Sequence, residues 1–181
     1  MGKTAALLLA LALLPLPAAA QTADTGFAGA AYGRAKSGLP CPPGDTCDDN
    51  ASAWKLFFGG RFDENFGGEV SFIQTRDFER SASDHVSTRA FNLSVLAGIP
   101  LPRNSFVFGK LGVLLGHVEV GGVSQDGWGP SFGVGGMIGL TRNLALRLDW
   151  DRYGFKMPSG GGERENIDML TVGAQYVFGG R

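Results

Sequence analysis

The 181-residue chain lacks the features that mark several common protein classes. It contains only two cysteines, too few for a disulfide-built miniprotein or a four-ligand structural zinc site. It has no basic excess, because 16 Lys and Arg residues face 17 Asp and Glu residues, and this balance argues against a nucleic-acid partner. Beyond the N-terminus no run of 18 apolar residues occurs, so no membrane-spanning helix is expected there.

Apolar residues and glycine, by contrast, are abundant. Hydrophobic residues make up 44% of the chain, which excludes a disordered protein. Glycine occupies 29 positions without a collagen period, so its abundance needs another explanation.

The first twenty residues have the order of a secretory signal. Lys3 gives a positive start, residues 5–14 are only Ala and Leu, and small residues at 18–20 precede Gln21. The alternative is a membrane anchor, but the apolar run is shorter than the ~20 residues that a spanning helix needs. We therefore predict a signal peptide at 1–20 and one barrel domain at 21–181.

The mature part of the chain alternates with a period of two. In 144–150 the even positions are large and apolar, whereas the odd positions are small or charged. This alternation is typical of a strand with one apolar face. Similar segments lie at 91–99, 132–140 and 170–178, with weaker ones near 27–34, 53–62, 67–78 and 106–118. The sequence therefore predicts eight strands, and no stretch is typical of a capped helix.

The connections between these strands alternate in length. The short ones are 63–65, 102–104 and 142–143, and the longer ones are roughly 35–52, 79–88, 119–130 and 154–166. Eight antiparallel strands joined in this way place all short turns at one end and all long loops at the other. This arrangement is typical of outer-membrane barrels, with periplasmic turns and extracellular loops. We predict an all-β, eight-stranded antiparallel up-and-down transmembrane barrel.

In a soluble ligand-carrying barrel the apolar face points inward. Two features indicate that the apolar face of this barrel points outward instead. The polar face is rich in glycine, which a crowded, narrow lumen explains better than a solvated surface. These glycines are Gly59, Gly98, Gly112, Gly116, Gly133, Gly135, Gly139 and Gly173. Aromatic residues gather at the strand ends, as in the two interfacial girdles of membrane barrels. They are Trp54, Trp128, Trp150 and Tyr153 near the long loops, and Phe62, Phe66, Tyr176 and Phe178 near the turns.

Three segments carry a resemblance to a known family. The residues at 58–66 (FGGRFDENF), 147–150 (RLDW) and 169–178 (MLTVGAQYVF) resemble the OmpA transmembrane barrel family, and the resemblance covers 26–178. It implies an outer-membrane location in a Gram-negative bacterium, contact with outer-membrane lipids and lipopolysaccharide, and a C-terminal strand recognised by the barrel-assembly machinery. The chain stops three residues after Phe178, so we expect no peptidoglycan-binding domain. Its architecture is closer to the barrel-only OmpX and Ail group, which is associated with adhesion and surface protection.

Strand alternation also predicts charged residues inside the barrel. The residues expected to point inward are Lys55, Arg61, Glu69, Lys110, Arg147, Asp149 and Gln175. In the OmpA family a lumenal Glu–Arg pair acts as a gate, and the resemblance places that pair on Glu69 and Arg147. Lys110 and Asp149 match two further charged positions of the family network, whereas a remaining Lys–Glu pair falls on Leu96 and Met137. We favour a network of ion pairs that plugs and rigidifies the barrel over a regulated pore, since charges in a narrow interior should pair.

The first long loop contains both cysteines. Cys41 and Cys47 are six positions apart in a turn-rich segment, and export to an oxidising compartment predicts a disulfide between them. Asp45, Asp48 and Asp49 could hold a divalent cation, but their spacing lacks the EF-hand order, and a solvated acidic loop is the favoured interpretation.

No catalytic, cofactor-binding or metal site is predicted. Outer-membrane lipid A deacylases place a serine two residues after a rim histidine, whereas Glu119 stands two residues after His117 here. An ordinary interfacial histidine is therefore favoured. The sequence predicts a structural or surface-interaction role through the long loops. The alternatives are a small gated pore, a lipid A-modifying enzyme and a soluble carrier.

Overall fold

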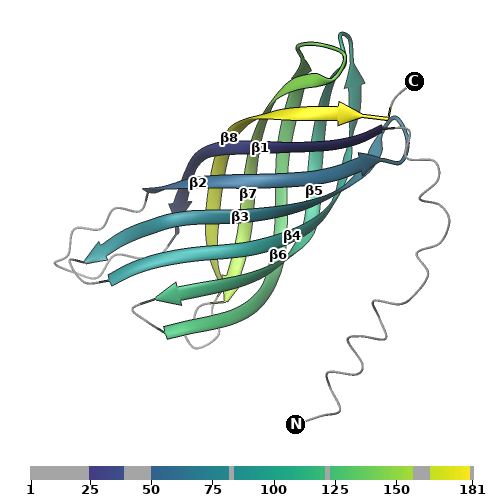
Figure 1. The fold of residues 1–181 in the computed structure, drawn as a ribbon. Helices are drawn as coiled ribbons and strands as arrows, with labels where there is room; N and C mark the ends of the chain where they lie inside the picture. The colour runs from purple at the N-terminus through teal and green to yellow at the C-terminus, as the bar shows by residue number, and fades with distance from the viewer. Residues whose placement is uncertain (1–24, 39–49, 82–83, 121–122, 157–163, 180–181) are drawn as a thin grey trace, which may run out of the picture.

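The described part of the chain is a single closed β-barrel. The computed structural model describes residues 25–38, 50–81, 84–120, 123–156 and 164–179, and these residues contain eight strands and no helix. The strands are β1 (Thr25–Ser37), β2 (Asn50–Arg61), β3 (Phe66–Ser81), β4 (Asp84–Leu101), β5 (Ser105–Val120), β6 (Val123–Gly139), β7 (Leu144–Lys156) and β8 (Arg164–Phe178). They pair in chain order, and β8 pairs antiparallel with β1 from Gly26↔Phe178 to Ser37↔Ile167 (Figure 1). The predicted eight-stranded, all-β up-and-down barrel is confirmed.

The three short connections lie where the sequence predicted them, but two of the predicted long loops are wrong. β3 continues to Ser81 and β4 begins at Asp84, so most of 79–88 is strand. β5 continues to Val120 and β6 begins at Val123, so most of 119–130 is strand as well. These strand ends lack a clear apolar alternation, yet the backbone ladder continues without it, because backbone pairing does not depend on side-chain polarity.

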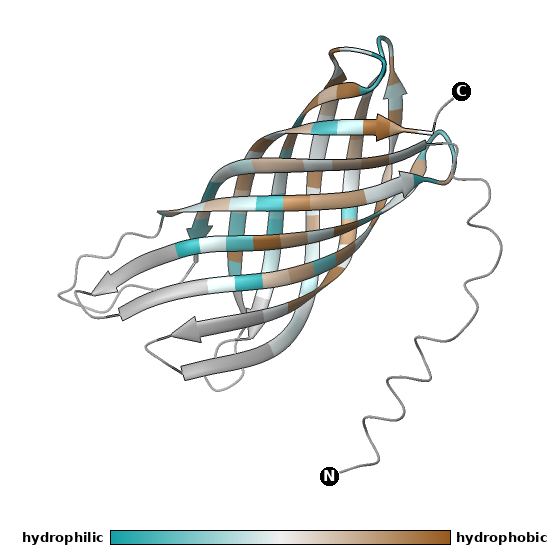
Figure 2. Ribbon diagram, viewed as in Figure 1, coloured by the Kyte–Doolittle hydropathy of each residue, from teal (hydrophilic) through white to brown (hydrophobic). Residues whose placement is uncertain are grey.

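The distribution of apolar and charged residues is the reverse of that in a soluble protein, with apolar side chains outside the barrel and charged side chains inside. Leu93, Leu111 and Leu115 are 64%, 72% and 63% exposed on the outer face, whereas Lys55 and Glu69 are at most 1% exposed inside. Figure 2 shows the underlying alternation of hydrophobic and hydrophilic residues along the strands. The outward direction predicted for the apolar face is confirmed, and it is opposite to that of a soluble ligand-carrying barrel.

The glycines of the inner face are explained by crowding. A Cβ atom on Gly59 would lie 2.5 Å from the ring of Phe27, and one on Gly135 would lie 2.7 Å from the ring of Phe108. The Gly135 Cβ would also collide with Oδ1 of Asp149. Because side chains at the paired positions of neighbouring strands occupy this space, the inner face needs positions without a side chain, as the sequence predicted.

Aromatic residues lie at both ends of the outer wall, with one exception. Trp128, Phe62, Phe66 and Tyr176 are exposed on this surface. Tyr153, predicted to join the girdle at the long-loop end, is 2% exposed and lies inside the barrel. The prediction for Tyr153 was wrong because the residue shares strand parity with the inward-facing residues of β7.

The turn between β2 and β3 is organised by one carboxylate. Oδ1 of Asp63 accepts hydrogen bonds from the backbone N–H groups of Asn65 and Phe66, each at 2.7 Å. These two hydrogen bonds stabilise the charged form and hold the pKa of Asp63 below its ordinary value of 3.8. The carboxylate thus holds the turn most strongly while it is ionised.

Replacing Asp63 with alanine should lower stability in a pH-dependent way. Because the pKa of Asp63 is depressed in the folded state, its stabilisation is fully present above the ordinary value of 3.8 and is lost as the pH falls through the folded value. The urea midpoints of refolded wild type and Asp63→Ala should therefore differ at pH 7 and converge as the pH falls through the folded pKa, which lies below 3.8. Glu64→Ala, which removes a neighbouring exposed carboxylate, should not reproduce this convergence. A difference that stays constant down to the lowest pH would contradict the assignment.

Adding one methyl group inside the lumen should be costly. Gly135→Ala places a Cβ against Phe108 and Asp149, and overpacking of this kind costs about 1–3 kcal/mol. The matched control is Gly109→Ala, where the nearest atoms to a Cβ are carbonyl oxygens at 3.9 Å. Heat-dependent gel mobility of both refolded variants measures the effect. Equal unfolding temperatures for the two variants would show that the lumen is less crowded than described.

Candidate functional site

A layer of six charged side chains crosses the middle of the barrel interior. Three are cations, three are carboxylates, and none is more than 5% exposed. They are Lys55 on β2, Glu69 on β3, Lys110 on β5, and Arg147, Asp149 and Asp151 on β7. The layer is therefore neutral as a whole, which is the condition for burying so many charges together.

Arg147 joins the two halves of this layer. Its Nη2 lies 2.6 Å from Oε2 of Glu69, and its Nε lies 3.0 Å from Oδ2 of Asp149. Its Nη1 donates a hydrogen bond of 3.1 Å to Oε1 of Gln175. The guanidinium also lies 4.2 Å from the ring centroid of Phe57, within the range of a cation–π contact. Each end of the planar group thus has a partner.

Two lysines and two aspartates form the other half of the layer. Nζ of Lys55 donates to Asp149 at 2.7 Å and to Asp151 at 2.8 Å. Nζ of Lys110 lies 3.3 Å from Asp149 and also forms an ion pair with Asp151. Because each lysine contacts both carboxylates, removing any one of the four leaves the opposite charges with an incomplete set of partners.

All four residues of the predicted network lie in this layer. Glu69 contacts Arg147, and Asp149 contacts both Arg147 and Lys110. Sequence reasoning missed Asp151 and left Lys55 outside the network, although it placed Lys55 in the lumen. The signal for Asp151 was present, because it lies two residues after Asp149 on the same strand and so shares its face.

Apolar clusters lie on both sides of the charged layer. The cluster toward the long loops contains Ala35, Ala51, Ala53, Ile73, Ala90, Leu114, Tyr153, Ile167 and Met169. The cluster toward the short turns contains Phe27, Ala31, Phe57, Leu96, Phe106 and Phe108, with Met137 and Val177 packed against it. The apolar positions Leu96 and Met137, where the resemblance places a family ion pair, belong to this second cluster. The charges therefore interact in a poorly solvated interior, where electrostatic attraction is strong.

Other residues singled out in the sequence take no part in this layer. Cys41, Cys47, Asp45, Asp48 and Asp49 lie outside the described residues, so the disulfide stays a prediction. His117 lies on β5, where its backbone pairs in register with Arg89 of β4 and Asp126 of β6. Within the described segments there is no group of three or more side chains suited to bind a metal ion, and no helix is long and apolar enough to cross a membrane.

A comparison with protein-family models identifies the family. The model described as "Outer membrane protein beta-barrel domain" matches residues 6–178. The chain belongs to this outer-membrane β-barrel family. It is accordingly a protein of the Gram-negative outer membrane, and its exposed apolar wall is the surface that faces lipid. In such barrels the short turns face the periplasm and the long loops face the exterior.

Solved structures of outer-membrane barrels share the fold. Ail of Yersinia pestis is 17% identical, with a TM-score of 0.60 over 86% of this chain and 99% of that chain. The Neisserial surface protein NspA is 15% identical, with a TM-score of 0.65 over 85% of this chain and 96% of that one. OprG of Pseudomonas aeruginosa is 15% identical, with a TM-score of 0.52 over 85% and 95%. No match was found among curated proteins.

Removing Arg147 should destabilise the barrel strongly. Arg147→Ala leaves Glu69 buried without its ion-pair partner, and breaking a buried pair in this way costs about 3–5 kcal/mol. The unfolding temperature in detergent, followed by heat-dependent gel mobility, should fall markedly.

The matched control is Arg152→Ala. Arg152 pairs with Asp168 at 2.5 Å, but both side chains are about a third exposed, so the pair should contribute little to stability. If Arg147→Ala unfolds at the same temperature as Arg152→Ala, the buried pair is not a stabilising element.

Proposed function

We propose that the protein is a closed outer-membrane barrel whose lumen is plugged by the charged layer, and that it acts structurally or through surface interactions of its extracellular loops. The observation that carries the proposal is the neutral set of six mutually paired charges between two apolar clusters. Eight-stranded barrels have interiors just wide enough to be filled by side chains, which agrees with this arrangement.

A plug of this kind opposes the passage of ions. A cation passing through the lumen would have to displace Lys55 or Lys110 from Asp149 and Asp151. Each of these aspartates already contacts both lysines. The cation would then have to cross the ring-lined cluster that contains Phe27, Phe57 and Phe108. Both steps are costly in a poorly hydrated interior.

A gated pore is the second candidate, and one feature favours it. Among the described residues, the carboxylate of Glu69 has Arg147 as its only ion-pair partner, whereas Asp149 and Asp151 have several. Glu69 is therefore the carboxylate whose release would disturb the layer least. If the layer opens, we expect it to open between β3 and β7.

Planar-bilayer conductance of the refolded protein separates the two candidates. Wild type and Glu69→Ala should both be electrically silent if the lumen is plugged, because the two apolar clusters and the Lys–Asp part of the layer remain. Asp168→Ala, which removes a carboxylate from the outer wall, is the control for nonspecific leakage. Folding of every sample is checked by heat-dependent gel mobility. A discrete conductance in wild type that rises in Glu69→Ala would overturn the plug and establish the pore.

The membership of the outer-membrane barrel family and the apolar outer surface suggest further binding partners. We propose that the apolar outer face contacts outer-membrane lipids and lipopolysaccharide, and that the barrel-assembly machinery recognises the alternating final strand at 169–178.

Ail has been crystallised with the heparin analogue sucrose octasulfate. In this chain residues 38–49 include three aspartates and no Lys or Arg, so that loop is unsuited to a sulfated sugar. We also propose no enzymatic role, since Glu119 replaces the serine expected after a catalytic His117.

A further inference from the structure

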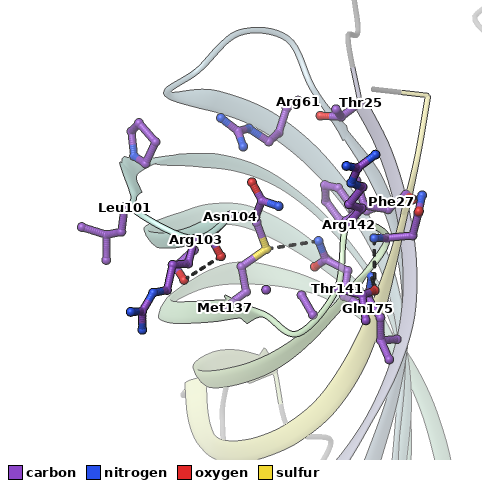
Figure 3. Close-up of a pocket in the computed structure, with 17 residues that line it drawn as sticks. Thr25, Phe27, Arg61, Leu101, Arg103, Asn104, Met137, Thr141, Arg142 and Gln175 are labelled. Carbon is purple, nitrogen blue, oxygen red and sulfur yellow. Dashed lines mark hydrogen bonds between the residues drawn. The ribbon is translucent and has the colours of Figure 1, made fainter. Parts of the chain in front are cut away.

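The barrel contains a second distinctive feature at its periplasmic end. A cavity of about 400 Å³ opens there, bounded by parts of β1, β2 and β8 and by the turns that follow β4 and β6 (Figure 3). The cavity lies on the periplasmic side of the charged layer, and Gln175 contacts both the layer and the cavity. Oε1 of Gln175 accepts from Arg147, while its Nε2 lies 3.3 Å from Sδ of Met137 at the inner end of the cavity.

The polar lining of this cavity is cationic. Arg61, Arg103 and Arg142 all line it, and none of the described residues that line it is an aspartate or a glutamate. Figure 3 shows Arg61 and Arg142 on different sides of the cavity, whereas the guanidinium of Arg103 points away from Met137 and Gln175. Arg61 and Arg142 are therefore the two groups positioned to receive an anion.

Among the described residues no carboxylate forms an ion pair with Arg61, although the positive charge of Arg61 contributes to the lowered pKa of Asp63. The carboxylate of Asp63 is engaged by backbone N–H groups of its own turn. Glu64 offers Arg61 only its backbone carbonyl, which accepts from Nη2 at 2.7 Å. Nε of Arg61 is buried and has no hydrogen-bond partner within the described residues, and its guanidinium lies 4.7 Å from the ring centroid of Phe106. The guanidinium is thus held in place by the Glu64 carbonyl and the Phe106 ring without an ion-pair partner in the described part of the chain.

The inner part of the cavity is apolar. Phe27, Met137 and Val177 line it, and all three belong to or pack against the apolar cluster below the charged layer. A volume of about 400 Å³ is typical of a small-molecule site, and such sites combine an apolar lining with a few convergent polar groups. Guanidinium groups suit carboxylate and phosphate oxygens because they can donate two parallel hydrogen bonds.

We propose that this cavity binds a small amphipathic anion from the periplasm. Its carboxylate or phosphate head lies between Arg61 and Arg142, and its short hydrocarbon part contacts Phe27 and Met137. The site lies on the periplasmic side of the charged layer, so it is accessible whether or not the lumen conducts ions.

Methionine methyl resonances provide a direct test. The full chain, refolded in zwitterionic micelles with ¹³C-methyl methionine, is titrated separately with hexanoate and with hexyl phosphate. Met137→Leu assigns the Met137 signal, and Met169, in the cluster toward the long loops, serves as the internal reference. We expect at least one of the two anions to shift Met137 saturably and to leave Met169 unchanged. Hexan-1-ol, which lacks the charge, should not produce a saturable shift.

Arginine variants test the head-group assignment. Arg61→Gln and Arg142→Gln should each weaken binding of the active anion at least tenfold, and Arg61→Lys should weaken it less because the charge remains. Arg142→Gln leaves the Asp63 turn intact, so it remains informative if Arg61→Gln folds poorly. Arg89→Gln, on the outer wall, should bind like wild type. The proposal is overturned if neither anion binds, if hexan-1-ol shifts Met137 equally, or if both glutamine variants retain wild-type affinity.

Discussion

Charge neutrality inside the barrel is the constraint on which the other interior features depend. The apolar face is directed at lipid, so the polar side chains on the other face of the strands point into a space too narrow for bulk water. Charges in that space are tolerable only as partners of one another, since an isolated buried ion is very costly. The lysines contact both aspartates, and Arg147 connects that group to Glu69. One strand, β7, supplies three of the six charges, which makes it the strand on which the interior is organised.

Space is the second constraint, and it explains the composition of the chain. The aromatic rings and long charged side chains that fill the lumen need facing positions with no side chain at all. Gly135 faces Phe108 and Asp149, and Gly59 faces Phe27. The glycines of the inner face are therefore a consequence of packing.

The sequence predicted the architecture and much of the interior, but not the ends of the strands. Alternation places Lys55, Glu69, Lys110, Arg147 and Asp149 inside because strand geometry alone decides which face a residue occupies. Where the alternation fades, as at 79–88 and 119–130, the pattern no longer distinguishes strand from loop, although backbone pairing continues. Tyr153 has the residue type and the strand-end position of a girdle residue, but its parity places it inside with Asp149 and Asp151. The contacts within the charged layer, including those of Asp151, depend on the stagger between strands, which a single sequence does not reveal.

The unequal strand lengths give the barrel a taller side. β3 to β6 contain 16 to 18 residues, whereas β1, β2 and β7 contain 12 or 13. Four additional residues extend a strand by about 13 Å, and Figure 1 shows these strands reaching beyond their neighbours. On one side of the barrel, the hydrogen-bonded sheet formed by β3 to β6 therefore extends farther than the sheet formed by the shorter strands β1, β2 and β7. Within the described residues, strand pairing thus fixes the outer end of the barrel more completely on one side than on the other.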